Sequence, residues 1–230
     1  MANYLIIGGS SGIGRALVDQ LLAEGHQLTV WSREQRDLPA GVTFATADVT
    51  DAAELPADGL PDSLDGLVYC PGNIDLKSFR SLKPDAFRSA FELNVVGAVR
   101  CIQAAERRLK KAENQASIVL FSTVAVQRGL PFHAGIAAAK GGVEGLTRSL
   151  AAEYAPRWRV NAIAPSLTDT PLAGNLLATP EKREAGAERH PLKRIGTAGE
   201  MAALAAFLLS EKAAFITGQI IGADGGMGSI

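Results

Sequence analysis

Short apolar runs alternate with longer helical segments along the whole chain, and this alternation restricts the fold more than any other feature. A run such as Ile118–Phe121, in which every side chain is apolar, is typical of a parallel strand buried on both faces. Strands that alternate with helices predict a parallel sheet covered by helices on both sides. The fold class is therefore α/β, with a doubly wound parallel sheet of about seven strands in a single domain.

The element boundaries follow from the same pattern. We expect strands at Tyr4–Ile7, Gln27–Trp31, Val42–Ala45, Gly66–Cys70, Ser117–Phe121, Arg159–Ile163 and Gln219–Gly222. The main helical segments are Gly12–Ala23, Pro84–Lys110, Ala134–Tyr154 and Ala198–Ser210. The least regular stretch, Leu167–Ile195, precedes the last helix, and we expect it to form a mobile lid over a substrate site.

Composition excludes several classes of function. The net charge of −1 gives no field that would attract nucleic acid or an anionic membrane. No apolar run reaches the roughly 18 residues that span a bilayer, and the N-terminus lacks a signal-peptide pattern. Cys70 and Cys101 show no metal-ligand spacing and indicate a reducing compartment. We therefore expect a cytoplasmic protein with no metal, nucleic acid or membrane as partner.

A glycine-rich turn follows the first predicted strand and leads into a predicted helix. Glycines permit a tight turn and a close backbone approach to a pyrophosphate, which the N–H groups of the helix N-terminus then bind. Glycines also punctuate ordinary loops, but the position between a strand and a helix favours a nucleotide site. The residues expected to contact the nucleotide are Gly8, Ser10, Ser11, Gly12, Ile13 and Gly14.

The end of the second predicted strand indicates which nicotinamide cofactor is bound. Proteins that bind NAD on this fold place an acidic residue there to hold the ribose 2′-hydroxyl. This chain has Ser32 and Arg33 instead, and a guanidinium pairs well with a 2′-phosphate. The alternative is a solvated loop arginine. The sequence therefore favours NADP(H).

The order of these motifs resembles the short-chain dehydrogenase/reductase family, and within it the 3-oxoacyl-carrier-protein reductases. The resemblance covers the whole chain through the Gly-x-x-x-Gly-x-Gly turn, Asn94, Lys140, the Arg159–Pro165 strand, and Ile216–Gln219 followed by Asp224–Gly226. It implies a Rossmann-type fold, a nicotinamide cofactor and a small carbonyl substrate. It also implies a homodimer or homotetramer.

The resemblance assigns roles to individual residues. Lys140 would bind the nicotinamide ribose, and Asn94 would hold a water of the proton relay. Further cofactor contacts would come from Asp48 and Val49 at the adenine, and from Gly72, Pro165 and Thr170. The sequence departs from the family at Tyr69–Gly72, where Asn-Asn-Ala-Gly is usual, although Gly72 keeps the close backbone approach.

The catalytic pattern of the family is incomplete in this chain. Family members carry a tyrosine four residues before the lysine, because residues four apart share one helix face. That position is Ile136, and the family's catalytic serine corresponds to Thr123, which follows Ser122. Thr123 and Ser122 still provide hydroxyl groups that could hydrogen-bond to the carbonyl oxygen of a substrate. A positioned acid contributes about 10²–10⁴-fold, so a reductase without a replacement should be slow.

Two histidines are candidates for the missing chemistry. His133 lies three residues before Ile136, and a histidine can act as an acid at neutral pH. The alternative for His133 is a surface histidine at the rim of the cleft. In that case water would supply the proton. His190 in the expected lid is a candidate for substrate contact, against the simpler interpretation of an exposed loop histidine.

Three functions remain open at the level of sequence. The leading hypothesis is an NADPH-dependent reductase of a ketone or 3-oxoacyl substrate with an atypical mechanism, because the cofactor motifs are retained. The second is a non-catalytic NADP(H)-binding subunit or redox sensor that partners an active paralogue in a hetero-oligomer. The third is a non-redox isomerase or dehydratase, since fold alone does not determine function.

Overall fold

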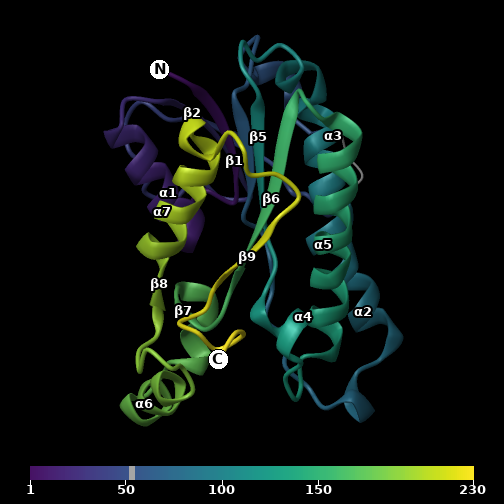
Figure 1. The fold of residues 1–230 in the computed structure, drawn as a ribbon, viewed down its shortest axis with the longest axis vertical. Helices are drawn as coiled ribbons and strands as arrows, with labels where there is room; N and C mark the ends of the chain where they lie inside the picture. The colour runs from purple at the N-terminus through teal and green to yellow at the C-terminus, as the bar shows by residue number, and fades with distance from the viewer. Residues whose placement is uncertain (52–54) are drawn as a thin grey trace.

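The computed structural model describes residues 1–51 and 55–230, and it contains one large parallel sheet. Its seven strands lie in the order β3-β2-β1-β4-β5-β6-β9 (Figure 1). Their bounds are β1 Asn3–Ile7, β2 Gln27–Ser32, β3 Thr43–Thr46, β4 Gly66–Tyr69, β5 Ala116–Phe121, β6 Trp158–Pro165 and β9 Ile220–Ala223. The predicted fold class is confirmed, and each strand lies where its apolar run predicted it.

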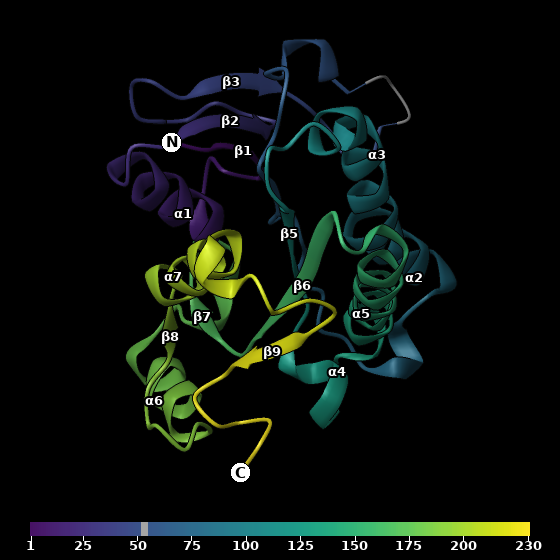
Figure 2. The ribbon, with the colours of Figure 1, turned by 45° about the horizontal axis from the view of Figure 1, so that its top comes forward.

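Helices cover both faces of this sheet (Figure 2). One face carries α1 (Gly12–Ala23) and α7 (Ala198–Leu209), and the other carries α2 (Pro84–Phe91), α3 (Gly97–Leu109) and α5 (Ala134–Tyr154). Neighbouring residues of β1 serve the two cores in turn, because successive side chains of a strand point to opposite faces. Leu5 packs in the core shared with α3 and α5, while Ile6 packs in the core shared with α1 and α7.

The strand order reverses at β1, which has β2 on one side and β4 on the other. In open α/β sheets, the crevice outside the carboxyl ends of the strands at such a reversal is the usual place for a ligand. The glycine-rich turn begins directly after β1, at this crevice. Topology therefore directs attention to the ends of β1, β4, β5 and β6.

The predicted helical segment Pro84–Lys110 is not one continuous α-helix. A π-helical turn at Glu92–Val96 separates α2 from α3, and Asn94 is buried in that turn. The Asn94 Nδ2 donates to the Ala90 carbonyl at 2.8 Å, the acceptor that its own backbone N–H would use in an α-helix. The Asn94 side chain therefore takes the place of its own N–H at the Ala90 carbonyl. The turn then contains one residue more than an α-helical turn.

The segment Leu167–Ile195 has more regular structure than the sequence predicted. It contains β7 (Thr168–Asp169), a 3₁₀ turn at Pro171–Leu176 and α6 (Pro180–Glu188). A two-residue strand, β8 (Gly196–Thr197), pairs with β7. The segment lies beyond the carboxyl ends of the strands, across from the short helix α4 (Val124–Arg128) (Figure 1). Within the described residues, none of the helices is long and apolar enough to cross a membrane.

Candidate active site

The glycine-rich turn forms a backbone cradle at the start of α1. Gly8 and Gly12 have φ angles of +77° and +54°, which side-chain-bearing residues rarely adopt. A Cβ on Gly14 would clash with the Gly8 carbonyl, so the turn closes tightly on the helix. Ser11, the N-cap residue, makes no side-chain cap in the described structure, which leaves the first helical N–H groups free for an anion.

The residues at the end of β2 suit a phosphate group. Ser32 is buried, and within the described residues its hydroxyl has no hydrogen-bond partner. Arg33 follows it on the surface, and no ion pair of Arg33 occurs among residues 1–51 and 55–230. A buried hydroxyl without a partner, followed in sequence by an exposed guanidinium without an ion pair among the described residues, fits the 2′-phosphate that distinguishes NADP(H) from NAD(H).

The residues predicted at the adenine lie just beyond β3. Asp48 Oδ1 accepts hydrogen bonds from the Thr50 N–H at 2.9 Å and from the Thr50 hydroxyl at 2.7 Å. The Thr50 hydroxyl and N–H hold the pKa of Asp48 below its usual value, and Arg33 adds to this effect. Val49 is buried, and its carbonyl accepts a hydrogen bond from Arg100 at 3.0 Å. The Asp48 carboxylate is therefore held in place by Thr50 and ionised.

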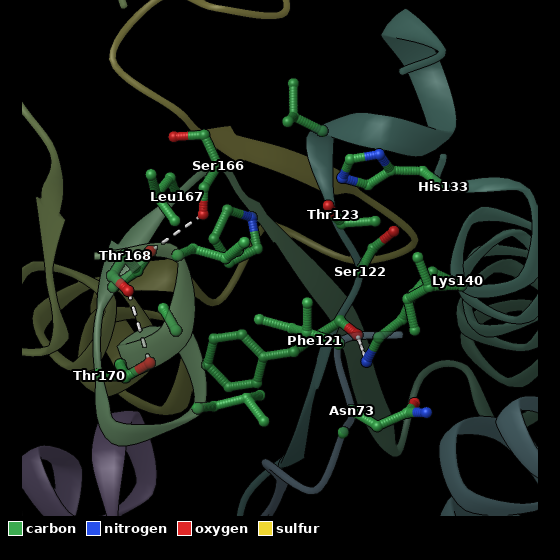
Figure 3. A pocket seen from close by; sticks show the side chains of 18 of the residues that line it. Asn73, Phe121, Ser122, Thr123, His133, Lys140, Ser166, Leu167, Thr168 and Thr170 are labelled. Atoms are coloured by element: carbon green, nitrogen blue, oxygen red, sulfur yellow. Dashed lines mark hydrogen bonds between the residues drawn. The ribbon is translucent and has the colours of Figure 1, made fainter. Parts of the chain in front are cut away.

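A cavity of about 260 Å³ lies beyond the carboxyl ends of β4, β5 and β6 (Figure 3). Most of its lining is apolar, with a small number of polar groups, which is the usual composition of a small-molecule site. The predicted site residues that line it are Ile13, Gly72, Ser122, Thr123, His133, Ile136, Lys140, Pro165 and Thr170. The structure thus brings part of the predicted cofactor set around one cavity, together with every candidate catalytic residue except Asn94.

Lys140 provides a buried positive charge in this cavity. Its Nζ donates to the Phe121 carbonyl at 2.7 Å, and no carboxylate pairs with it in the described part of the chain. Burial lowers the pKa of Lys140 to about 8. Gly72 lies next to this ammonium, since a Cβ at that position would be 3.5 Å from Nζ, an ordinary van der Waals contact. The ammonium is therefore available to a ligand hydroxyl that reaches the cavity.

Asn94 presents a free acceptor next to this lysine. Its Nδ2 donates to Ala90 and to the Asn73 side chain, at 2.8 and 3.0 Å. Its Oδ1 is buried and has no partner among the described residues, and a Cβ on Gly72 would lie 3.4 Å from it. A buried carbonyl oxygen without a donor suits a bound water, and the role of Asn94 in holding one stays a prediction.

The two hydroxyls at the end of β5 differ in availability. Thr123 caps α4, and its Oγ1 accepts from the Ala125 N–H at 3.3 Å, which leaves its own hydrogen free. Ser122 Oγ donates at 2.8 Å to Glu144, a buried carboxylate on α5, and points toward that helix (Figure 3). Thr123 is therefore the hydroxyl that is free to donate to a substrate oxygen.

Ile136 and His133 lie at the start of α5. Ile136 lines the cavity one turn before Lys140, with 8% of its surface exposed. His133 is the residue before the helix, it is half-buried, and its Nδ1 lies 2.7 Å from the Pro131 carbonyl. Figure 3 shows its ring on the cavity wall beside Thr123.

The interpretation of His190 as an exposed loop histidine is wrong. Only 1% of its surface is exposed, because α6 and Gly225 pack against it. Its Nδ1 lies 2.8 Å from the Gly186 carbonyl and its Nε2 lies 2.8 Å from the Ser166 hydroxyl. His190 therefore attaches the lid segment to the end of β6, and it is not among the residues that line the cavity.

Sequence reasoning missed three supporting residues. Asn73 holds the Asn94 amide, Glu144 holds Ser122, and Ser166 holds His190. Glu144 had a detectable signal, because it lies four residues after Lys140 on the same helix face. Asn73 and Ser166 had none, since their partners are distant in sequence.

Comparison with known proteins gives one consistent result. A family model described as enoyl-(acyl carrier protein) reductase matches residues 8–228. The 2-(S)-hydroxypropyl-CoM dehydrogenase 3 of Xanthobacter autotrophicus is 34% identical over 245 residues, covering 98% of this chain and 96% of that protein. The 3-oxoacyl-[acyl-carrier-protein] reductase MabA of Mycobacterium tuberculosis is 32% identical, covering 98% and 92%.

Solved structures agree with these sequence matches. The ligand-free aldohexose dehydrogenase of Thermoplasma acidophilum superposes with a TM-score of 0.91 at 29% identity, covering 98% of this chain and 93% of that one. The ElxO protein with NADP bound superposes with a TM-score of 0.90 at 26% identity, and each chain is covered completely, at 100%.

Proposed function

The chain belongs to the short-chain dehydrogenase/reductase family, and we propose that it is an NADP(H)-dependent oxidoreductase that reduces a carbonyl group without the family's tyrosine. The observation that carries this proposal is that two polar groups, the Lys140 ammonium without an ion pair and the free Thr123 hydroxyl, line one apolar cavity in the described part of the chain. The Asn94 Oδ1 lies beside Gly72 of the cavity wall and has no partner among the described residues. A purely structural role would not require a buried ammonium and a free hydroxyl at the same cavity.

The cofactor assignment is supported from both ends of the site. The backbone cradle at Gly8–Gly14 suits a pyrophosphate, and Ser32 with Arg33 suits a 2′-phosphate. Lys140 would hold the nicotinamide ribose, and Thr170 and Pro165 line the cavity where the nicotinamide would lie. The NADP found in the ElxO structure agrees with this preference.

The chain's own residues would orient the substrate. NADP(H), when bound, supplies or accepts the hydride. The Thr123 hydroxyl would donate to the carbonyl oxygen, while Asn94 and Lys140 would hold a water and a ribose hydroxyl beside it. The apolar lining would exclude other water, which strengthens these hydrogen bonds and prevents competing proton transfer.

The substrate we propose is a ketone or 3-oxoacyl compound. The cavity is small and mostly apolar, and the lid segment contributes Leu167, Leu172 and Leu176 to its wall. The 3-oxoacyl-[acyl-carrier-protein] reductase and levodione reductase among the relatives act, by their names, on carbonyl compounds. We further propose that the protein works in the cytoplasm as a homodimer or homotetramer, and that the segment Leu167–Ile195 closes over the substrate.

One observation favours a second candidate, a non-catalytic NADP(H)-binding subunit. Ile136 fills the wall of the cavity one turn before Lys140, where the resemblance places the catalytic tyrosine. A side chain without an exchangeable proton at that position suits a protein that binds the cofactor and stabilises an active relative.

Two measurements on the purified protein separate these candidates. Fluorescence titration with NADPH and NADH measures whether each cofactor binds. NADPH oxidation over a panel of ketones and 3-oxoacyl thioesters then measures turnover. Tight NADPH binding with turnover supports the oxidoreductase, whereas tight binding without turnover on any member of the panel supports the subunit.

A further inference from the structure

We propose that His133 is the acid–base catalyst of this site and exchanges a proton with the substrate oxygen that Thr123 orients. This inference rests on the proposed function and specifies how the reaction proceeds without a tyrosine. It is carried by the chemistry of the groups that line the cavity and by the orientation of the His133 ring.

Among the described residues, four side chains that line the cavity carry a titratable group, and three of them are unsuitable. Burial raises the pKa of Cys70 to about 12, so its thiol is inert at neutral pH. Arg189 is exposed at the rim and does not release its proton in proteins. The Lys140 Nζ donates to the Phe121 carbonyl, and the proposed function assigns it to the cofactor ribose. His133 is the remaining group.

The hydrogen bond to Pro131 fixes the tautomer of His133. A carbonyl oxygen only accepts, so the Nδ1 that lies 2.7 Å from the Pro131 oxygen must carry a hydrogen. The Nε2 is then the nitrogen that gains or loses the proton. Figure 3 shows a ring nitrogen of His133 directed toward the Thr123 hydroxyl. The exchanging nitrogen and the orienting hydroxyl therefore face the same space.

The other two histidines of the chain lack this freedom. Both ring nitrogens of His190 lie 2.8 Å from a partner. His26 Nδ1 accepts from the Ala2 N–H at 3.2 Å, its Nε2 lies 3.7 Å from Glu24, and the residue is absent from the cavity wall. His133 is also half-buried, so solvent can restore its proton after each turnover.

The step balances in both directions. In reduction, the carbonyl carbon gains the hydride that the reduced cofactor loses, and the carbonyl oxygen gains the proton from Nε2. The neutral imidazole then takes a proton from water. In alcohol oxidation, Nε2 accepts the hydroxyl proton as the hydride leaves. Reduction therefore requires protonated His133 and falls as pH rises, while oxidation requires neutral His133 and rises with pH.

The test compares the wild type with His133→Gln, which keeps a polar side chain of similar size but does not ionise. We expect kcat for ketone reduction to fall by about 100-fold in the variant. We also expect the variant to lose the limb of the pH–rate profile along which reduction slows as pH rises. Lys140 and Arg189, the other charged groups facing the cavity, remain in both proteins, so only the limb that disappears belongs to His133. His26→Gln is the matched control and should keep both rate and profile.

A second readout does not depend on turnover. In protein labelled with ¹³C-histidine and saturated with NADP⁺, the His133 resonance is assigned by its absence in His133→Gln. We expect its titration midpoint to coincide with the kinetic limb measured in the same buffer. We also expect Ile136→Tyr in the His133→Gln background to restore at least about tenfold in kcat, because it supplies another acid.

Two results would overturn the inference. The first is a His133→Gln variant that reduces ketones within threefold of the wild type with an unchanged pH profile. The second is a His133 resonance whose midpoint differs from the kinetic limb. A wild type that binds NADPH and turns over no substrate would instead overturn the proposed function, and it is recognised before any variant is made.

Discussion

The cofactor half of this site is formed mainly by backbone groups, whereas the substrate half is formed by side chains. The cofactor half consists mainly of backbone, namely the left-handed glycines after β1 and the free N–H groups of α1. The substrate half consists of side chains at the ends of β5 and α5, where Thr123, His133, Ile136 and Lys140 meet. A backbone site keeps its chemistry while many side chains change. A side-chain site changes its chemistry with each substitution, and the departures from the family's catalytic pattern, at Thr123 and Ile136, lie there.

The largest effect we predict comes from restoring the family's acid. Ile136→Tyr places a phenol one helix turn from Lys140, whose ammonium stabilises the phenolate. In the His133→Gln background, which lacks the proposed acid, kcat for ketone reduction should rise by about 10³-fold. Ile136→Phe is the control, because it adds the ring without the hydroxyl. Equal rates in both variants would show that shape, and not proton supply, limits this half.

The next effect concerns the stability cost of the buried charge. The difference between the Lys140 pKa of about 8 and its ordinary value of 10.5 corresponds to about 3 kcal/mol. The unfolded chain binds the extra proton between these values, so stability rises with pH across that window. Lys140→Met should therefore be up to about 3 kcal/mol more stable than the wild type at pH 7.

Urea unfolding at pH 7 and at pH 10.5 measures this difference. The gain from Lys140→Met should shrink at the higher pH, where the wild-type lysine is neutral in the folded state and half deprotonated in the unfolded state. A gain that is equal at both pH values would mean that the methionine packs better. It would also mean that the buried ammonium does not lower the free energy of unfolding.

A third test addresses the backbone half through its tightest contact. Gly14→Ala introduces a Cβ against the Gly8 carbonyl, and the turn must shift to relieve it. We expect a loss of about 2 kcal/mol, or roughly 30-fold in NADPH affinity, measured by fluorescence titration. Gly145→Ala on the exposed side of α5, where a Cβ meets nothing within 4 Å, is the matched control. Unchanged affinity in Gly14→Ala would contradict a backbone cradle.

The smallest effect is expected at Arg33, whose side chain we propose to contribute to the choice of cofactor. Arg33→Ala should weaken NADPH binding by about tenfold, or about 1.4 kcal/mol, and leave NADH binding unchanged. Arg107→Ala at the end of α3 serves as a control for net charge. Equal losses for both cofactors would mean that Arg33 senses overall charge and does not bind the 2′-phosphate.

The sequence predicted the sheet well because each strand is an uninterrupted apolar run. It also predicted α1 and α5 with the bounds that the structure has. It missed α6, because Pro180–Glu188 has no apolar stripe, although Thr179 and Pro180 form a typical helix start. The cofactor residues followed from spacing because glycines and helix N-termini act through the backbone.

The substrate half was harder to predict because it depends on contacts between distant segments. Burial of His190 results from the packing of α6 and the C-terminal loop, and no local pattern reports that packing. The orientation of His133 depends on the Pro131 carbonyl, which spacing from Ile136 does not reveal. The absence of the family's tyrosine at Ile136 was visible in the sequence. Which nitrogen of His133 faces the cavity could be learned only from the structure.

The π turn at Glu92–Val96 also makes the chain tolerant of a change in length at this point. The wider turn accommodates one more residue than an α-helical turn, so the face that α3 presents stays nearly unchanged. The buried stripe of α3, which includes Ala98, Cys101 and Ala105, therefore still packs on the sheet. Deletion of one residue in this turn would restore α-helical geometry with little rotation of α3, whereas the same deletion within α3 would rotate the rest of that helix by about 100° against its core.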